Sequence, residues 1–545
     1  MRKGKGVAAV LFAACAPCAI ASDGSSGVRA DAIHGHIAFL ADDVLEGRGT
    51  ATRGHELAAA YVASQFASYG LEPAGDHDTW YQTVPLIESS VVISGASARL
   101  ERDGKYIELA IKADFLPRAG FWQSEVTLSG PMTFVGYGVH APELGHDDFA
   151  GVNLSGRIAV ILTGAPAALP PDVRAYYASI AVKGAQLSAR GAIGVLGIGA
   201  PVEDPTSAWE RRVLLSSLPA MRATGADGRP LDAFSQLRAG LILSPTGAAK
   251  LFTGAAHALD DVYASATQSR VQSFDLPGSI RFSTKSEITR RSSRNVIALL
   301  EGSDPKLKSE YVVLSAHLDH LGVGAPVDGD SIYNGALDNA SGVAMMLEGA
   351  RVLKTRAGRP KRSVIFIAFT GEEKGLLGSE YFLRYPTLSR AAIVADVNID
   401  MPVALTRFKD LVAFGAEHST IGRIARAAAA RESLVFTPDS LPEEVRLVRS
   451  DQYSFLRHGI PAILMDVGTH AALRAVNGYE LVAAFYSARY HMPGDDSSQP
   501  LDYAFLATLT RVNLHIVYDI ANANARPQWL SGDFFAGKSM PTAGD

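Results

Sequence analysis

The residues most capable of chemistry lie in one stretch, from Ser315 to Glu373. It contains the segments SAHLDHLGVG, NGALDNASG and FIAFTGEEKG, which combine histidine, aspartate and a Glu-Glu pair with apolar runs typical of strands. Charged side chains beside such runs are costly to bury unless they are paired or bind a metal ion. The stretch therefore indicates a metal site with imidazole and carboxylate ligands.

Strand ends would bring these candidate ligands together. His317 ends the apolar run YVVLSAH, the pair Glu372–Glu373 follows SVIFIAFT, and Asp400 ends AIVADVNID. If these runs are strands of one parallel sheet, their carboxyl ends meet at one edge, where ligand sites of open α/β sheets lie. Asp338, before an amphipathic helix, and His491, in the late loop YHMPGDD, could reach the same edge.

This set supplies two histidines and three carboxylates as ligands and leaves one carboxylate as a base. Mixed imidazole and carboxylate ligation suits Zn²⁺, and an aspartate shared by two ions can hold them about 3.5 to 4 Å apart. Each residue also has an ordinary alternative. A lone histidine is more often packed or solvated, and a Glu-Glu pair at a helix start is usually a favourable charge at the helix dipole. The prediction rests on their joint placement.

The segments HLDHLG, NGALDNASG, TGEEKGLLGS, NIDM and YHMPGDD, in this order, resemble the metal-binding series of the M28 family of dizinc peptidases. The resemblance spans most of residues 290–500. It implies two Zn²⁺ ions per chain, one bound by His317 and Asp400 and the other by Glu373 and His491.

The bridging and supporting roles also follow from this resemblance. Asp338 would bridge the two ions, and the peptide bond from it to Asn339 would be cis. Glu372 would be the general base. Asp319 would orient His317 through the second nitrogen of the imidazole ring, as a residue behind the ligands.

The implied reaction is hydrolysis of a peptide bond by a hydroxide that bridges two zinc ions, with Glu372 taking up and returning the proton. Tyr490, beside His491, is a candidate donor to the developing oxyanion, with an ordinary half-buried tyrosine as the alternative. The expected substrate is therefore a peptide.

Hydrophobic periodicity predicts the elements that must position these residues. Residues 30–70 are predicted to form two helices. From Arg294 onward, apolar runs alternate with helical stretches near 340–355 and 420–432, and a last helix covers about 503–523. This alternation predicts an α/β fold with a mostly parallel central sheet flanked by helices on both faces. The resemblance specifies a zinc-aminopeptidase-like, phosphorylase/hydrolase-like version of it.

A β-rich segment interrupts this pattern between about Val92 and Leu162, with short runs such as VTLSG and RIAVIL. FVGYGVHAPELGHDDFAGVNLSGRIAVIL followed by VKGAQLSARGAIGVLGI resembles a protease-associated (PA) domain, with a generic β module as the alternative. Its expected role is a lid or substrate-restricting wall. The predicted domains are a signal peptide at 1–21, a discontinuous catalytic domain at 30–115 plus 285–530, an inserted PA domain at 116–284, and a flexible tail at 531–545.

The N-terminus predicts export. MRKGK is basic, the apolar run after it is shorter than the about 20 residues that span a bilayer, and Ala19-Ile20-Ala21 is a small-residue cleavage pattern. We expect a periplasmic or secreted protein without a membrane span, with a lipid anchor at Cys15 as the alternative. Cleavage removes both cysteines and three basic residues, which excludes disulfides and changes the net charge from −5 to −8. Nothing in this balance favours nucleic-acid binding.

Other functions fit the sequence less well. No G-x-S-x-G or H-E-x-x-H motif occurs, which disfavours serine hydrolase and zincin chemistry. A non-catalytic relative with PA-plus-peptidase architecture, such as the transferrin receptor, lacks a working metal site, whereas the ligands here are intact. A mononuclear cyclase of the glutaminyl cyclase type lacks the PA insertion. The signal peptide and the family favour an exported aminopeptidase; a carboxypeptidase or dipeptidase stays open, because the sequence does not show which side chains line the pocket.

Overall fold

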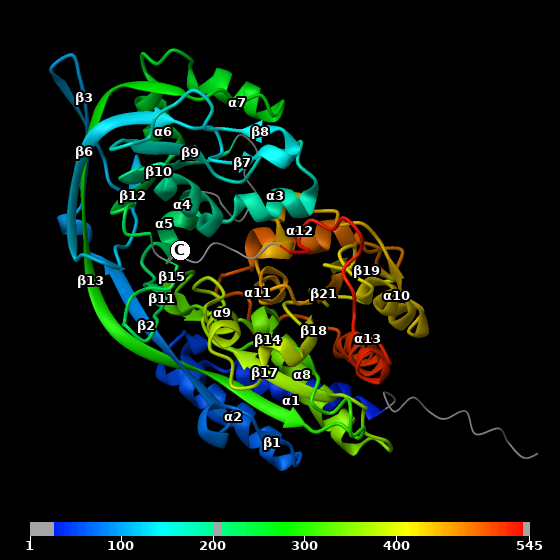
Figure 1. Ribbon diagram of the computed structural model, residues 1–545. Helices are drawn as coiled ribbons and strands as arrows, with labels where there is room; N and C mark the ends of the chain where they lie inside the picture. The colour runs from blue at the N-terminus through cyan, green and yellow to red at the C-terminus, as the bar shows by residue number, and fades with distance from the viewer. Residues whose placement is uncertain (1–26, 201–208, 233, 538–545) are drawn as a thin grey trace, which may run out of the picture.

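The chain folds around one long strand that two sheets share (Figure 1). The structure, a computed structural model, describes residues 27–200, 209–232 and 234–537. Strand β13 (Phe274–Leu300) pairs along its first part with β3 and β6 of a smaller sheet. Along its second part it pairs with β2 (Tyr81–Val91) and β17 (Ser363–Phe369) of a larger sheet. The two sheets are therefore joined by continuous hydrogen-bonded backbone.

The larger sheet is parallel at its centre. β14 (Tyr311–His317) lies between β17 and β18 (Ile393–Asn398) and is parallel to both, and β18 is parallel to β21 (Ala462–Val467). Antiparallel strands flank this centre, with β13 beside β17 and β19 (Asp410–Phe414) beside β21. The predicted α/β fold class, with strands and helices alternating, is confirmed.

Helices cover both faces of the larger sheet. Successive residues of a strand point to opposite faces, and Val312 and Leu314 of β14 pack into one hydrophobic core whereas Val313 packs into another. Helices on the first face are α1 (Ala30–Leu40), α2 (Arg53–Ser68), α8 (Gly342–Thr355), α10 (Ile421–Arg431) and α13 (Tyr503–Asn522). Helices on the second are α9 (Leu377–Arg384) and α11 (Gln452–Arg457). Both faces of the central strands are apolar because both are covered.

The smaller sheet gathers the β-rich segment. Its parallel strands are β6 (Glu125–Phe134), β9 (Ile158–Leu162), β10 (Gly194–Ile198) and β12 (Ala239–Leu243). β3 (Ser97–Arg102) and β4 (Lys105–Leu109) lie in the range expected for the catalytic domain, yet β3 pairs with β13 in this sheet and β4 pairs with β3. The smaller sheet therefore begins near residue 97, not 116, and we call residues 97–284 the inserted unit.

The inserted unit is tied to the larger sheet in a second way. Its short strand β11 (Ala220–Ala223) pairs with β2 of the larger sheet.

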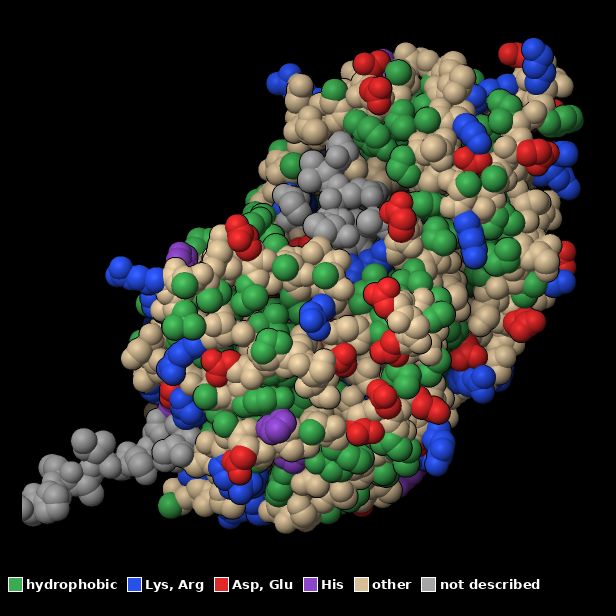
Figure 2. All heavy atoms as spheres, turned by 180° about the vertical axis from the view of Figure 1, so that it is seen from behind, with side chains coloured by type: hydrophobic (Ala, Val, Ile, Leu, Met, Phe, Trp, Pro, Cys, Tyr) green, Lys and Arg blue, Asp and Glu red, His purple; other side chains and the backbone are tan. Residues whose placement is uncertain are grey.

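The helices of the inserted unit are α3 (Pro171–Ala178), α4 (Ile180–Ala189), α5 (Trp209–Leu215), α6 (Pro245–Phe252) and α7 (Leu259–Thr267). Seen from behind, Lys and Arg side chains are intermixed with Asp and Glu over both units (Figure 2).

The C-terminal segment is packed further than the sequence predicts. A flexible tail is expected from residue 531, but Phe535 is 1% exposed and contacts the rings of Tyr176 and His418. Aromatic packing therefore holds this segment as far as Phe535. The predicted signal peptide and residues 538–545 lie outside the described residues. Within the part of the chain that the structure describes, no helix is long and apolar enough to cross a membrane.

Candidate metal centre

The first half of the site forms at the ends of two paired strands. β14 ends at His317, β18 ends two residues before Asp400, and the parallel register places Ser315 opposite Asn398. This register brings the two functional side chains together, and His317 Nε2 lies 3.0 Å from Asp400 Oδ1. Sheet hydrogen bonding thus fixes two predicted ligands beside each other.

Asp338 lies between two histidines. Its Oδ1 is 3.1 Å from His317 Nε2, and its Oδ2 is 3.3 Å from His491 Nε2. The peptide bond to Asn339 is cis, as the resemblance implies. Asp495 holds this segment by accepting hydrogen bonds, each 3.0 Å long, from the backbone N–H of Asp338 and of the residue before it. The carboxylate is therefore placed where two cations could share it.

The second half of the site combines a strand–helix turn with a late loop. Glu373 follows β17, and His491 follows α12 (Gly478–Ala488). Glu373 Oε2 is 3.0 Å from His491 Nε2, while Glu373 Oε1 is 2.7 Å from His320 Nδ1. One carboxylate therefore contacts two histidines, of which sequence analysis assigned a ligand role only to His491.

Glu372 and Asp319 lie beside this cluster. Glu372 is 8% exposed and lines the pocket into which the cluster opens. Asp319 contacts His317 with its backbone, because its carbonyl oxygen is 3.0 Å from His317 Nδ1. Its carboxylate instead accepts hydrogen bonds from Thr50 Oγ1 (2.6 Å) and from the Glu372 N–H (3.2 Å). The main chain of Asp319 thus orients the histidine, and its side chain supports Glu372.

Burial and charge shift the pKa values of these groups in opposite directions. Burial, opposed by His317, raises the pKa of the Glu372 carboxyl well above its ordinary value. Burial also acts on Asp338, but hydrogen bonds from His317 and His491 outweigh it and hold the pKa of that carboxyl well below its usual range. Burial lowers the pKa of His491, and its carboxylate partners raise it more strongly, to about 9. The opposite shifts show that the carboxylates of the site stabilise positive charge placed among them.

The donor atoms fit a pair of metal ions. Two groups have their ligand atoms within 4.8 Å of one another, namely His317, Asp338 and Asp400, and His320, Asp338 and Glu373. Asp338 belongs to both groups, and His491 contacts two members of the second. Nitrogen and oxygen donors in such clusters suit Zn²⁺. The arrangement could therefore activate water and polarise a carbonyl group.

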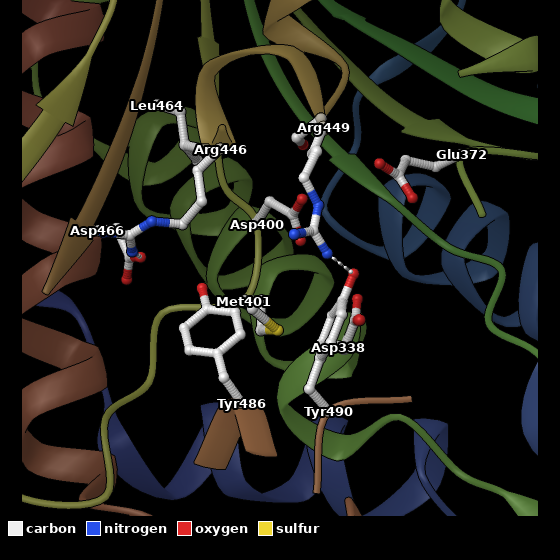
Figure 3. A pocket seen from close by; sticks show the side chains of 11 residues that line it. Asp338, Glu372, Asp400, Met401, Arg446, Arg449, Leu464, Asp466, Tyr486 and Tyr490 are labelled. Carbon is white, nitrogen blue, oxygen red and sulfur yellow. Dashed lines mark hydrogen bonds and ion pairs between the residues drawn. The ribbon is translucent and has the colours of Figure 1, made fainter. Parts of the chain in front are cut away.

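A pocket opens beside the cluster (Figure 3). Tyr490 and Arg449 face each other in it, and Arg449 Nη2 donates to the Tyr490 hydroxyl at 2.9 Å. Arg449 also pairs with Glu444 at 2.8 Å, and Arg446 pairs with two aspartates, one of them Asp466, at 2.5 and 2.6 Å. The pocket wall therefore contains arginines whose charge is matched by carboxylates.

Some supporting residues were missed by sequence analysis. Asp495 lies inside a motif that was singled out, YHMPGDD, so its presence near the site could have been inferred. His320, in HLDHLG, was weighed as a ligand on sequence grounds and given a structural role. Arg48 lies outside any such motif. It is 1% exposed and donates hydrogen bonds to backbone carbonyls near both ligand segments, including those of Leu318 and Gly335. Only the folded structure brings it to the site.

Comparison with known families agrees with this geometry. Residues 295–517 match the model of peptidase family M28, a span that contains both halves of the site. The segment that carries the candidate metal centre is therefore similar to peptidase family M28.

Curated relatives align with parts of the chain. A probable zinc metalloprotease of Pyrenophora teres f. teres is 36% identical over 106 residues, 19% of this chain and 22% of that protein. A probable zinc metalloprotease of Pyricularia oryzae is 29% identical over 258 residues, 42% of this chain and 50% of that protein. A probable leucine aminopeptidase 2 of Aspergillus fumigatus is 29% identical over 251 residues, 44% and 46% of the two chains. The chain thus spans half or less of each relative's length.

Similarity to a solved structure extends over most of this chain. The aminopeptidase from Aneurinibacillus sp. strain AM-1 matches with a TM-score of 0.54 and 20% identity, over 92% of this chain and 96% of that one. At this identity the likeness establishes a shared fold. The shared fold therefore includes the β-rich insertion within the aligned length.

Proposed function

We propose that this chain is an exported zinc-dependent exopeptidase that removes N-terminal residues from peptides. The observation that carries this proposal is the position of Asp338, whose two carboxylate oxygens each face a different histidine. Glu372, buried beside them, supplies a carboxylate that is not needed as a ligand. The match of residues 295–517 to peptidase family M28 supports the same conclusion.

In this proposal two zinc ions share Asp338. One would be held by His317 and Asp400, the other by Glu373 and His491. When bound, such ions polarise a substrate carbonyl and lower the pKa of a water molecule. Hydrogen bonds from behind orient two of these ligands, since the Asp319 carbonyl oxygen contacts His317 Nδ1 and His320 Nδ1 contacts Glu373 Oε1.

The remaining residues handle protons and developing charge. Glu372 accepts the proton of the attacking water and returns it to the leaving amine. Its burial suits this role, because a general base acts best when its pKa is raised towards the working pH. Tyr490 accepts a hydrogen bond from Arg449 and keeps its own hydroxyl hydrogen, which it can donate to the carbonyl oxygen as negative charge develops.

The pocket bears on the direction of cleavage. A carboxypeptidase needs a cation for the terminal carboxylate of its substrate. Among the described residues that line the pocket, the basic ones are Arg446 and Arg449, and both already pair with acidic side chains. This pairing favours an aminopeptidase. A dizinc carboxypeptidase or dipeptidase is the second candidate, because the Arg449 side chain is 30% exposed.

The inserted unit is proposed to be a PA domain that restricts which substrates reach the site. Its parallel strands β6, β9, β10 and β12 and the motifs of the β-rich segment support this assignment. The basic and apolar N-terminus is proposed to direct export to the periplasm or medium, with cleavage after residue 21.

Metal content and turnover test the proposed chemistry together. Purified protein should contain close to two zinc ions per chain and hydrolyse aminoacyl-nitroanilides. Glu372→Gln, which keeps the shape of the side chain, should retain both ions and lose about 10²- to 10⁴-fold in turnover. Protein that binds no zinc and hydrolyses no peptide would support a non-catalytic binding protein of PA-plus-peptidase architecture, and unchanged turnover in Glu372→Gln would overturn the role of Glu372 as the base.

A panel of peptides tests the direction of cleavage. The same peptide should be offered free, acetylated at its N-terminus, and amidated at its C-terminus. An aminopeptidase cleaves the free and amidated forms but not the acetylated one. Cleavage of the acetylated form, with loss of activity on the amidated form, would support the carboxypeptidase instead, and cleavage restricted to free dipeptides would support the dipeptidase.

A further inference from the structure

A helix of the inserted unit reaches the rim of the metal site. α5 contacts β15 (Gly322–Val327), and the two elements lie side by side (Figure 1). β15 and its partner β16 (Asp330–Tyr333) form the hairpin between His320 and Asp338. The inserted unit therefore packs against the hairpin that leads from the His317–His320 segment to Asp338.

Arg211 of α5 makes a second contact, with the C-terminal end of α12, which leads to His491. The residue is 5% exposed, and its Nη1 donates a hydrogen bond of 3.1 Å to the carbonyl oxygen of Tyr486, in α12. Its Nη2 donates to the carbonyl oxygen of Tyr490, just beyond the end of that helix. The last carbonyl groups of a helix lack partners within the helix, and a cation there also interacts favourably with the helix dipole. A guanidinium from the inserted unit therefore completes the end of α12.

The backbone that Arg211 holds leads directly into a metal-ligand position. His491 follows Tyr490 and has a φ of 56°, in the left-handed region that side chains other than glycine rarely adopt. Such a conformation persists where neighbouring groups hold it. The rings of Tyr490 and His491 stack with their centroids 3.7 Å apart at an angle of 26°. The orientation of the imidazole thus depends on how firmly Tyr490 is held.

The hydroxyl group and the backbone carbonyl group of Tyr490 each accept a hydrogen bond from an arginine. Arg449 bonds its hydroxyl from the peptidase side, and Arg211 bonds its carbonyl from the inserted unit. The carbonyl contact fixes the main chain from which His491 projects. The hydroxyl contact fixes the ring against which His491 stacks.

We propose that Arg211 is a positioning residue through which the inserted unit fixes His491 in its metal-binding orientation. This inference rests on the proposed function, because it concerns the same metal site. It adds a claim that the proposed function does not make. Zinc binding by Glu373 and His491 depends on Arg211, which lies outside the M28 match at residues 295–517. The affinity of the half that contains His317 and Asp400 does not.

The experiment measures zinc binding to metal-stripped full-length protein. Zinc would be titrated in competition with a chromophoric chelator, for the unchanged chain, Arg211→Ala and Arg211→Lys. The matched control is Arg229→Ala, which removes an arginine of the same unit that is 73% exposed and 3.7 Å from Asp227. Loss of a residue that orients a metal ligand typically weakens metal binding by about 10- to 100-fold.

The expected result is a selective loss. In Arg211→Ala one of the two zinc affinities should fall by about 10- to 100-fold while the other stays at its original value. Arg211→Lys, which keeps the charge and can reach one carbonyl, should lose less, and Arg229→Ala should lose nothing. Because Arg211→Lys retains part of the contact, it carries the test if the alanine variant does not fold.

Two results would overturn the inference. Two unchanged zinc affinities in the Arg211 variants would show that His491 is held without this contact. An equal fall of both affinities would show that Arg211 supports the fold as a whole. Failure of the proposed function looks different, because the unchanged chain itself would then bind fewer than two zinc ions.

Discussion

The two halves of the metal centre are built in different ways. His317 and Asp400 project from adjacent strands of the central sheet, and parallel pairing sets their separation. Glu373 and His491 come from a turn and a late loop, and His491 depends on contacts from distant parts of the chain. His491 is also the more open histidine, with 20% of its side chain exposed against 1% for His317. The first half is therefore part of the scaffold, whereas the second half is held in place by packing.

The largest expected effect is the loss of the residue that both halves share. Asp338→Ala removes a carboxylate that contacts His317 on one side and His491 on the other. Both zinc affinities should fall by more than about 100-fold, since this exceeds the effect of losing a residue behind a ligand. Zinc per chain, measured by atomic absorption, checks this. Asp330→Ala, in the preceding hairpin, is the control and should keep both ions.

Single histidine variants compare the halves directly. His317→Ala and His491→Ala should each lose one ion and keep the other. The ion kept in His491→Ala lies in the half fixed by the sheet, so it should be bound about tenfold more tightly than the ion kept in His317→Ala. Competition with a chelator measures both. If the zinc ion kept in each variant is bound equally tightly, the two halves do not differ in how firmly their ligands are held.

A His320 variant tests whether the contact between His320 and Glu373 helps to hold the second half of the site. Its Nδ1 is 2.7 Å from Glu373 Oε1, so His320→Ala should free that carboxylate to rotate. We expect about a tenfold loss in one zinc affinity, with the His317 half unchanged. If both affinities stay unchanged, Glu373 is held by the metal and by His491 alone.

The smallest effect concerns the junction between the inserted unit and the peptidase. His418 lies 3.0 Å from Asp172 of α3 and 2.7 Å from Asp533, and these carboxylates outweigh burial and raise its pKa. A raised pKa stabilises the fold fully below the ordinary histidine pKa, about 6.5, and this stabilisation is lost as pH rises through the folded value.

His418→Asn should therefore destabilise the protein by about 1.5 kcal/mol in mildly acidic buffer, and by less at alkaline pH. Urea unfolding at a series of pH values measures this difference. A difference that grows with pH would contradict the charged state of His418. His458→Asn, which removes a histidine that lies 3.1 Å from Glu380 of α9, is the matched control.

Sequence patterns predict the first half of the site better than the second. Apolar runs mark β14 and β18, and parallel strands deliver residues at their carboxyl ends to one edge, so the meeting of His317 and Asp400 follows from local signals. His491 was found through the resemblance of its motif to a family pattern, because loop conformation leaves no periodic signal.

Contacts between distant residues could not be predicted from sequence. Arg211 and Tyr486 are 275 positions apart, and no spacing rule connects them. Asp319 shows a subtler limit: its closeness to His317 was predicted, but the atom that makes the contact is a carbonyl oxygen, which every residue carries. The start of the smaller sheet near residue 97 was missed because β3 looks the same whichever sheet it joins.

Strand β13 also governs how the two units can move. It is 27 residues long and stays paired from the smaller sheet into the larger one, beside β6 and then β2. A hinge between the two units would have to bend β13, and a sharp bend there would break hydrogen bonds to its neighbouring strands. The inserted unit is therefore held in a fixed position relative to the larger sheet. If the inserted unit restricts substrates as proposed, it would do so through its fixed shape and not through opening and closing.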